Sequence, residues 1–577
     1  MNMYKFNHSF LMFITIIIFL SFTLISCSNP NKQNSSNSTS SNSTSSEKSS
    51  NIDLQSSSIG NISSDSVIVS SSIVSKSDIS NSTSSPVSST VVAKNLAYYV
   101  DSANGDDNNS GKSTQKPWKT LGKVNSMVFS PGDVICFKSN AIFEGQFKPQ
   151  GSGTPDKPII VTSYGGDVKP IISGLGVQPA TVHLYNIQYW ELNNLEITNY
   201  NDTVTVRSGI LIDNEDGGIL NHIYIKDMYI HDVNGANLDS NWGYDRINGG
   251  IIVYTHGFIT KSAFNDILIQ RNYIKKVDRS GIFVYSTWSG RDTISEGYGQ
   301  WFPSTNVVIR NNVLNNIGGD GIVTAVTDGP LVEYNLVTYS NNRSGKNNIA
   351  IWTANSDNSV FQYNEAAYTQ LREGDGEGFD IDFGGTNNIM QYNYSHDNMG
   401  GFMLVCSFSS VSNKKGIVRY NISQNDRSRI IRVVGAATTQ CYFYNNTIYM
   451  GPLSNAKLLL TTGPEGDAGE AYFYNNIFIN LGTGGNDITD GAIFDYNCFY
   501  TPNLTIKPND PHIITADPML VNGGSGGIGI NTVDGYKLKT GSPCINAGRA
   551  IENNGGKDYW GNKVPNGLTD IGAQEKQ

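Results

Sequence analysis

Charged residues are scarce in this 577-residue sequence, since Asp, Glu, Lys and Arg make up only 16% of it. The 40 Lys and Arg are outnumbered by 50 Asp and Glu, which gives a formal net charge of -10. Nucleic-acid binding normally needs a basic face. The composition has no excess of basic residues to form such a face, so we expect no nucleic-acid partner.

Cysteine is also rare. The six cysteines show no CxxC spacing, so the sequence predicts neither a metal knuckle nor a disulfide-rich framework. By contrast, the chain has 59 Gly, 30 Tyr and many Asn. Low charge with abundant Gly, Asn and Tyr is typical of a long β architecture with many tight turns, and it suits a helical enzyme poorly.

The first residues predict an export signal. A start that contains Lys5 precedes an apolar run at 11–25, and the run stops just before Ser26 and Cys27. A short apolar core that ends in small residues is typical of a signal peptide and not of a membrane span. The ending resembles the bacterial lipobox, which implies that residues 1–26 are removed and that Cys27 carries lipid as the new N-terminus. The alternative is a plain signal peptide with an incidental cysteine.

Residues 27–93 are dominated by Ser and Asn and have no periodic apolar face. Such a segment cannot bury enough apolar surface to fold, so it predicts a flexible tether between the lipid and the remaining chain. From residue 94 to residue 577 the pattern predicts one folded domain. We therefore expect a monomer that is anchored through its lipid to the extracellular face of a bacterial cell membrane.

One short motif recurs throughout this domain. Apolar, β-branched and aromatic residues flank an Asn, at intervals within the range of roughly 20–50 residues that marks stacked supersecondary units. No helical period accompanies the motif, so it predicts an all-β fold, a single-stranded right-handed parallel β-helix whose Asn side chains stack in a turn ladder. A β-propeller is the alternative, but its blades need about 40 residues and four strands each. The asparagines of the motif include Asn272, Asn312, Asn335, Asn364, Asn393, Asn421, Asn446, Asn476 and Asn497.

A second strand, usually preceded by Gly, follows the Asn motif in each repeat. Stacked on one another, these runs predict one long parallel sheet whose side chains alternate between the interior and the outer face. We expect an N-terminal entry segment or cap at 94–170, coils at 171–504, and a closing segment at 505–577 that covers the open edge of the last coil. The second strands are expected at 281–284, 321–324, 349–352, 378–383, 401–405 and 430–433.

One coil breaks the pattern, because it places five carboxylates within the short stretch 373–382. Apolar residues alternate with Asp380 and Asp382 along its strand, so we expect both Asp to face outward into solvent, about 6.6–6.8 Å apart at their Cα atoms. Asp375 and Glu377 precede the strand in a Gly-rich turn that can fold over it. The apolar residues expected to face the core are Phe379, Ile381 and Phe383.

Paired carboxylates of this kind are what glycoside hydrolysis needs. One is held protonated so that it can donate to the leaving oxygen, and the other stays ionised to attack or to activate water. Crowding of acids raises the pKa of one member of the pair through like-charge repulsion. A solvated acidic turn and a structural Ca²⁺ site are the alternatives for the same residues.

Neighbouring coils supply further candidates for substrate binding. Trp352 lies one coil earlier and is expected in register with Asp382, where its ring offers a flat face to a sugar. Arg432 lies two coils later on the same outer face, where it binds a carboxylated substrate or pairs with Asp382. The pair His396-Asp397 recurs at 231–232, which favours a turn feature of the coil. The remaining substrate-binding candidates are Asp380, Glu377, Tyr285 and His396, with Trp288 as a weaker one.

The stretches 375–382 and 391–398 resemble a segment of secreted bacterial β-helix proteins that degrade carbohydrate. Within that group they are similar to the lacto-N-biosidase-type enzymes of glycoside hydrolase family 136, whose acid/base and nucleophile are two Asp seven residues apart. The resemblance implies a glycosidase for a poly- or oligosaccharide, with Asp375 as acid/base and Asp382 as nucleophile. Asp380 is a rival for either role. Since the turn can bring Asp375 to the separation of about 5–5.5 Å that retaining enzymes use, we expect retention.

The same coil also resembles the family 9 pectate lyases, which place a Ca²⁺ cluster of Asp beside a Lys base. That resemblance implies Ca²⁺ as cofactor, whereas the glycosidase needs no cofactor and no metal ligand. Residues 397–402 depart from the Asp-Asp-Gly-Trp-Asp run of that family, and no evident Lys lies on the outer face nearby. A non-catalytic surface glycan binder is the third alternative, since it needs aromatic residues on the face but no close carboxylate pair.

The lipid anchor leads to the first prediction. We expect mass spectrometry of the native protein to find an acylated Cys27 as the mature N-terminal residue, and fractionation to find the protein with the membrane, because the acyl chains partition into the bilayer. Cleavage at another residue, or recovery of the wild type wholly in the soluble fraction, would contradict this prediction.

Overall fold

A computed structural model describes most of the chain from residue 96 onward. The described residues are 96–237, 246–291, 299–345, 347–407, 411, 413–434, 440–460, 462–463, 466–467, 470–485, 492–502 and 508–577. The expected signal peptide at 1–26, the lipidation site Cys27 and the expected tether at 27–93 lie outside them. Within these ranges, no helix combines the length and the apolarity that crossing a bilayer requires.

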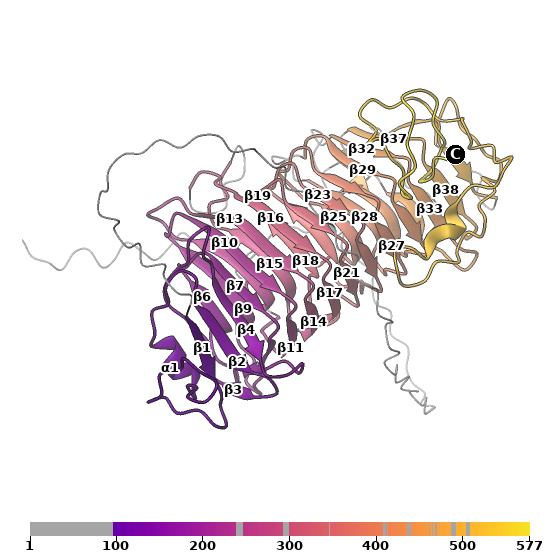
Figure 1. Cartoon of the computed structure of the whole chain (residues 1–577). Coiled ribbons are helices and arrows are strands. Elements are labelled where there is room, and N and C mark those ends of the chain that lie inside the picture. Colours follow the sequence, from indigo (N-terminus) through magenta and orange to yellow (C-terminus); the bar gives the residue numbers. More distant parts are fainter. Residues whose placement is uncertain are drawn as a thin grey trace, which may run out of the picture. The chain divides into compact units, whose positions relative to one another are not determined.

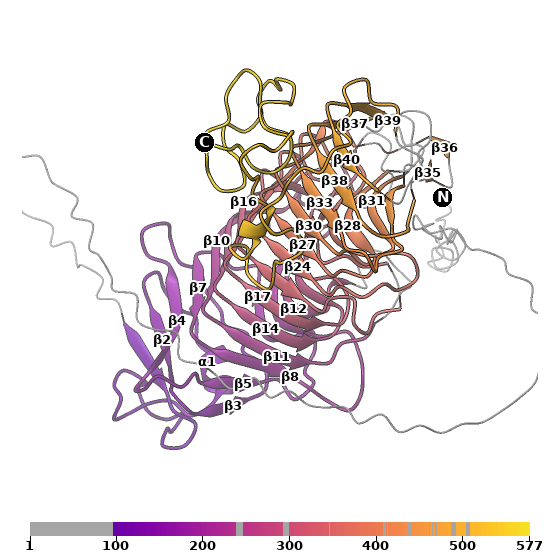
Figure 2. The ribbon, with the colours of Figure 1, turned by 90° about the vertical axis from the view of Figure 1, so that its right-hand side faces the viewer.

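The described residues fold as a right-handed parallel β-helix, as the sequence predicts. Successive coils add strands to three long parallel sheets, which we call the first, second and third sheet. Figure 1 shows strands of the third sheet, such as β15, β18, β25 and β28, side by side, and Figure 2 shows those of the second sheet from β24 to β40. All six runs expected to form the long sheet of second strands lie in the third sheet.

The strands of each sheet, in order of pairing, are as follows. The first sheet contains β1 (Ala97–Val100), β2 (Val134–Lys138), β4 (Ile159–Tyr164), β7 (Trp190–Asn193), β10 (Ile219–Lys226), β13 (Ala263–Gln270), β16 (Ser304–Arg310), β20 (Leu331–Glu333), β23 (Val360–Gln362), β26 (Ile389–Gln391), β29 (Gly416–Arg419), β32 (Gln440–Tyr444), β37 (Glu470–Tyr474) and β39 (Ala492–Asp495), with β19 (Thr327–Asp328) beside β16. The second contains β3 (Ile142–Glu144), β5 (Ile171–Ser173), β8 (Glu196–Asn199), β11 (Tyr229–Val233), β14 (Tyr273–Val277), β17 (Val313–Ile317), β21 (Leu336–Thr338), β24 (Glu365–Ala367), β27 (Tyr394–His396), β30 (Ile422–Gln424), β33 (Thr447–Met450), β38 (Ile477–Asn480) and β40 (Cys498–Tyr500). The third contains β6 (Ala180–Tyr185), β9 (Ser208–Glu215), β12 (Gly249–His256), β15 (Ser280–Ser286), β18 (Ile322–Ala325), β22 (Ile351–Ala354), β25 (Glu377–Ile381), β28 (Gly401–Cys406), β31 (Arg429–Val434) and β34 (Lys457–Leu460), while β35 (Thr462–Gly463) and β36 (Gly466–Asp467) form a small antiparallel pair.

Ile, Val, Leu and Phe side chains from all three sheets fill the interior of the coils. Because side chains alternate along a strand, every second residue points inward. In β25, for example, Phe379 and Ile381 lie in the interior, and Phe379 pairs in register with Ile351 and Met403 of the adjacent coils. A fully buried side chain of this size contributes roughly 1.5–3 kcal/mol to folding. The interior therefore holds the three sheets together along the whole solenoid.

The asparagine ladder expected from the repeat runs along one corner of the coils. In each step the side-chain carbonyl of one Asn accepts two hydrogen bonds from the Asn one coil earlier, as when Asn364 Oδ1 accepts from Asn335 N at 3.1 Å and from Asn335 Nδ2 at 2.9 Å. The residue in the left-handed conformation is the one before the ladder position, for example Tyr363 at φ 54°. The ladder Asn is thus selected for its amide pairing and not for its backbone angle.

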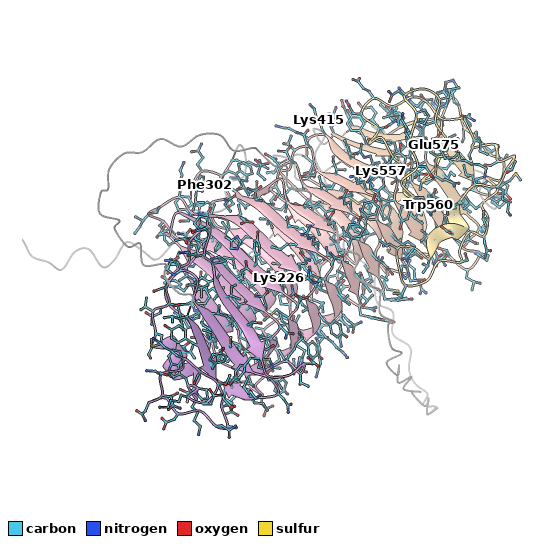
Figure 3. All side chains as sticks on the ribbon, viewed as in Figure 1. Lys226, Phe302, Lys415, Lys557, Trp560 and Glu575 are labelled. Atoms are coloured by element: carbon cyan, nitrogen blue, oxygen red, sulfur yellow. The ribbon has the colours of Figure 1, made fainter. Side chains whose placement is uncertain are left out.

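Each end of the solenoid is covered. Near the start, the short helix α1 (Leu121–Asn125) is capped by Thr120, whose Oγ1 accepts from Lys123 N at 3.1 Å. At the other end, Ile514 forms a parallel bridge with Cys498 of β40. Ile514 thereby occupies the free edge of the second sheet. The closing segment has one 3-10 helix, η2 (Val533–Tyr536), in its described part. Lys557, Trp560 and Glu575 of this segment are labelled in Figure 3.

The ladder supports a prediction about stability. Asn364→Ala removes the acceptor for two buried N–H groups of Asn335, and each buried donor left unpaired costs about 1–3 kcal/mol, so we expect the variant to lose about 3 kcal/mol or more. Urea unfolding followed by circular dichroism measures this loss.

Gln362→Ala is the matched control, because Gln362 lies in the same coil but its amide makes only partly buried bonds: it donates to Glu333 and accepts from Gln391. This control should change the free energy of unfolding by about 0.5 kcal/mol or less. Equal losses in the free energy of unfolding would show that a ladder hydrogen bond stabilises the fold no more than a partly exposed one.

Candidate active site

The acidic coil contributes β25 to the third sheet, and backbone pairing fixes its neighbours. Asp380 lies beside Trp352 of β22 and beside Leu404 of β28, which in turn lies beside Arg432 of β31. Arg432 therefore projects from the expected outer face. Trp352 is in register with Asp380, so the predicted register with Asp382 is wrong. The error arises because β22 begins at Ile351 and not at residue 349, which shifts the pairing by two residues.

The alternation expected along this strand ends early. Phe379 and Ile381 face the interior as predicted, whereas Phe383 does not. β25 ends at Ile381, and the N–H of Phe383 then donates to Asp382 Oδ1 at 2.9 Å. Phe383 packs instead into an apolar cluster on the outer side of the third sheet, together with Trp352. Alternation is a property of extended backbone, so it ceases to predict facing where the strand stops.

The predicted exposure of the acids is also wrong. Asp380 is 2% exposed and Asp375 is 7% exposed, while Asp382 is partly exposed. The Gly-rich turn folds back over the strand, because the backbone N–H groups of Arg372 and Asp375 donate to each other's carbonyls. The side chains point to the outer face of the sheet, but that face is covered.

Arg432 lies at the centre of the acidic cluster and has no exposed surface. Its Nη2 is 2.5 Å from Asp375 Oδ1, and its Nε is 3.6 Å from Glu377 Oε1. It therefore pairs with these two acids and not with Asp382, the protein partner expected from the sequence. A buried guanidinium needs such compensation, since an uncompensated charge in the interior costs several kcal/mol. The pairing also holds the turn that carries Asp375 against β31.

Burial raises the pKa of Asp380 well above its usual range, and repulsion from Asp382 and Asp375 raises it further. Burial also raises the pKa of Asp382, to about 7. The hydrogen bond from Phe383 N and the guanidinium of Arg246 oppose that second shift, while Asp375 adds to it. At neutral pH Asp382 therefore retains part of its protons, and the pKa of Asp380 is shifted in the same direction, which is the condition general acid catalysis needs.

Several polar atoms of the cluster lack a hydrogen-bond partner among the described residues. They include acceptors as well as donors, and each such buried atom costs about 1–3 kcal/mol when it stays unpaired. Folded proteins contain few groups of this kind. A ligand rich in hydroxyl groups satisfies both types of atom at once. The atoms without a hydrogen bond are Glu377 Oε1, Asp380 Oδ1, Arg429 Nε and Arg432 Nε, of which Glu377 Oε1 and Arg432 Nε form the longer ion pair described above.

The ring of Trp352 is not open to a ligand in this structure. The side chain is 3% exposed, its Nε1 donates to Asp320 Oδ1 at 2.9 Å, and the guanidinium carbon of Arg246 lies 5.3 Å from the ring centroid. Arg246 in turn donates through Nε to Asp320 Oδ2 at 2.9 Å. Trp352 thus forms part of the wall beside Asp380.

Sequence reasoning missed Arg246, Asp320 and Arg429. Arg246 reaches the site from an earlier coil, so no local spacing connects it to the acids. Arg429 precedes Arg432 by three residues at the start of β31, and its Nη2 lies 3.9 Å from Glu377 Oε1. The presence of two Arg on one strand, two coils after the acids, was the one available signal.

Tyr285 lies in β15, on the outer side of the third sheet and three strands from β25. Its ring stacks on that of Tyr254, with centroids 6.1 Å apart. At about 4.8 Å per strand, Tyr285 is roughly 14 Å from the acidic coil. It shares the face of the acids without contacting them.

His396 lies in β27 of the second sheet, so it is on a different face from the acidic coil. Its Nδ1 is 2.9 Å from Asp397 and its Nε2 is 3.1 Å from Glu365. Burial lowers the pKa of His396, but these two carboxylates outweigh burial and raise it to about 9. His231 makes the same contacts with Asp232 and Glu196 at 2.7 and 3.0 Å, so the recurring His-Asp pair is a feature of the coil.

In the described part of the chain, no group of three or more His, Cys, Asp or Glu is arranged to hold a metal ion. Around Asp375 and Glu377, the charges that compensate the acids are the guanidinium groups of Arg432 and Arg429.

Comparison with known proteins agrees with this geometry. No family model matches the chain. A lacto-N-biosidase of Bifidobacterium longum subsp. longum is 28% identical over an alignment of 612 residues, which covers 85% of this chain and 37% of that protein. The chain thus spans little more than a third of that relative's length.

A solved structure extends the likeness to the fold. The GH136 lacto-N-biosidase from Eubacterium ramulus superposes with a TM-score of 0.56 at 26% identity, over 68% of each chain. A second crystal structure of that enzyme, of the native protein, superposes with a TM-score of 0.54 at 25% identity. The chain is similar to the lacto-N-biosidases of glycoside hydrolase family 136. This confirms the family resemblance predicted from the acidic coil.

The raised pKa of Asp382 leads to a prediction about stability. Between about pH 4 and about pH 7 the unfolded carboxyl ionises while the folded one keeps its proton, so the wild type loses stability as the pH rises through this window. Asp382→Asn cannot ionise, and its free energy of unfolding should exceed that of the wild type by an amount that grows from about pH 4 to about pH 7 and is then constant. Urea unfolding across this range measures the difference.

Asp107→Asn should show the opposite sign. Burial alone would raise the pKa of Asp107, but hydrogen bonds from Thr120 and Lys119 lower it, so its ionised form stabilises the fold. The variant should be less stable than the wild type at neutral pH, and the difference should fade as the pH falls. If Asp382→Asn raised the free energy of unfolding by the same amount at every pH, this would contradict the raised pKa of Asp382.

Proposed function

We propose that this chain is a retaining glycoside hydrolase that acts on oligosaccharides outside the cell. The observation that carries the proposal is the acidic coil: four carboxyl groups at Asp375, Glu377, Asp380 and Asp382 are brought together on one covered face, with two of them protonated in part near neutral pH. The similarity to family 136 lacto-N-biosidases supports it.

Asp382 suits the role of nucleophile. It stands at the end of a strand whose preceding residue is anchored in the core, and the N–H of Phe383 holds its Oδ1 at 2.9 Å. A carboxylate fixed in this way can meet the anomeric carbon in line. Among Asp375, Glu377, Asp380 and Asp382 it keeps the most exposed surface, so a sugar reaches it before the other three.

Asp375 takes the role of acid/base in this proposal. It lies in the turn opposite the strand, and its charge raises the pKa of both Asp380 and Asp382. Substrate hydroxyls that bind Arg432 weaken its ion pair with Asp375 and free that carboxyl to act on the leaving group. Asp380 remains the rival, because burial raises its pKa well above the usual range and one of its oxygens has no hydrogen-bond partner.

The substrate class follows from the relatives. We propose a glycan that ends in lacto-N-biose, since the similar proteins are named lacto-N-biosidases. Asp380 and Glu377 bind the substrate beside Arg432, and Trp352 shapes the wall of the site. We further propose that a lipid on Cys27 places a monomeric enzyme at the outer face of the cell membrane, as the signal sequence predicts.

The assignment predicts the effect of two substitutions. Asp375→Asn and Asp382→Asn should each lower kcat by about a thousandfold or more on an oligosaccharide that ends in lacto-N-biose, because each removes one half of the catalytic pair. Each variant should remain folded by circular dichroism. Proton nuclear magnetic resonance of the first product formed should show the anomer of the substrate.

A second substrate distinguishes Asp375 from Asp380 as the acid/base. An activated nitrophenyl leaving group needs little protonation, so the acid variant should lose less rate on it than on a sugar leaving group. We expect this pattern from Asp375→Asn, whereas the same pattern from Asp380→Asn would move the acid role there. Near-normal activity of Asp382→Asn would refute the nucleophile. A product with an ultraviolet-absorbing double bond, together with loss of activity on chelation, would replace the hydrolase with a Ca²⁺-dependent lyase.

A further inference from the structure

The segment at 287–303, described at 287–291 and 299–303, lies against the coil that precedes the acids. Asn355 Nδ2 donates to Ser289 O at 2.8 Å, and Trp301 Nε1 donates to Asn355 O at 3.0 Å. Arg291 Nη1 donates to Asp357 Oδ2 at 2.7 Å. These bonds fix the described ends of the segment to the turn that follows β22. Phe302 of the same segment is labelled in Figure 3.

Asn355 is adjacent to the proposed nucleophile. Its N–H donates to Phe383 O at 2.7 Å, and the N–H of Asp382 donates to Thr353 O at 2.9 Å, so the two turns run side by side. Asn355 has φ 47°, a left-handed conformation that Asn tolerates better than most residues. Its side chain is 3% exposed, yet its Oδ1 has no hydrogen-bond partner.

Trp288 has a buried donor without a partner, which complements the buried acceptor of Asn355. Its side chain is 6% exposed and its indole N–H has no partner, although the backbone around it is well bonded, as in Phe302 N to Trp288 O at 2.9 Å. Trp288 precedes Ser289, the residue that Asn355 binds. A buried acceptor on Asn355 and a buried donor on Trp288, two residues linked through Ser289, therefore lack partners near the acidic coil, and each costs about 1–3 kcal/mol while it stays unpaired.

We propose that Trp288 and Asn355 form a subsite for hydroxyl groups of the sugar unit next to Asp382. Sugar hydroxyls both donate and accept hydrogen bonds, so they match the Asn355 acceptor and the Trp288 donor. A site built in this way rejects a sugar that lacks such a hydroxyl, because the buried group then remains unpaired. This inference rests on the proposed function and names residues that determine its sugar specificity.

Trp288→Phe tests the subsite, because it keeps an aromatic side chain and removes an N–H that bonds to no protein atom. We expect KM for an aryl lacto-N-bioside to rise between about threefold and about tenfold, with kcat nearly unchanged and a modest loss of thermal stability, since the smaller ring leaves a cavity. Asn355 is a poorer choice, since its substitution also breaks the bond to Ser289. Trp560→Phe is the matched control: its N–H bonds to Asp534 in the closing segment, and KM should not change.

Binding without turnover separates this inference from the proposed reaction. Calorimetry of lacto-N-biose with Asp382→Asn should show binding that weakens by the same factor when Trp288→Phe is added. Such binding in a protein without glycosidase activity would overturn the reaction and support the subsite. A KM or binding constant that Trp288→Phe leaves at the wild-type value, or the absence of any lacto-N-biose binding, would overturn the subsite.

Discussion

Hydrogen bonding between successive coils is the constraint on which the rest of the structure depends. Parallel strand pairing decides which residue of one coil stands beside which residue of the next, and the asparagine ladder locks that pairing at one corner of the coils. A slip of one residue would exchange the inner and outer faces of a strand. The placement of Asp380 between Trp352 and Leu404, with Arg432 one coil further on, is a consequence of this register.

The rigidity of the solenoid makes the acidic coil tolerable. Buried carboxyls with raised pKa values weaken the fold, and so do buried polar atoms without partners. Long stretches of apolar interior on both sides of β25 stabilise the fold and offset this cost. Sites that hold charges in unfavourable surroundings are typically where chemistry takes place, because the same surroundings shift pKa values toward those that catalysis needs.

The site is composite, although the fold is repetitive. β25 and its turn supply the acids, β31 supplies two guanidinium groups, and Asp320 and Arg246 from earlier coils hold the wall formed by Trp352. The segment at 287–303 adds Trp288 beside Asn355. The contributing pieces are loops and outward-facing strand residues on the outer side of the third sheet, where the solenoid tolerates variation because the interior does not depend on it. This division explains how one β-helix scaffold carries a specific carbohydrate site.

The sequence by itself determined the architecture and the location of the acidic coil. Periodic Asn and Gly-led apolar runs identify coils, because those residues satisfy backbone requirements that recur in every coil, and the acids at 373–382 stand out against that background. The tertiary structure alone decided the burial of Asp380, the outward packing of Phe383, the partner of Arg432 and the enclosure of Trp352. Those outcomes depend on where β22 and β25 begin and end and on contacts with residues such as Arg246 and Asp320, which are distant along the chain. A local pattern carries no information about such contacts, since they arise only when the coils stack.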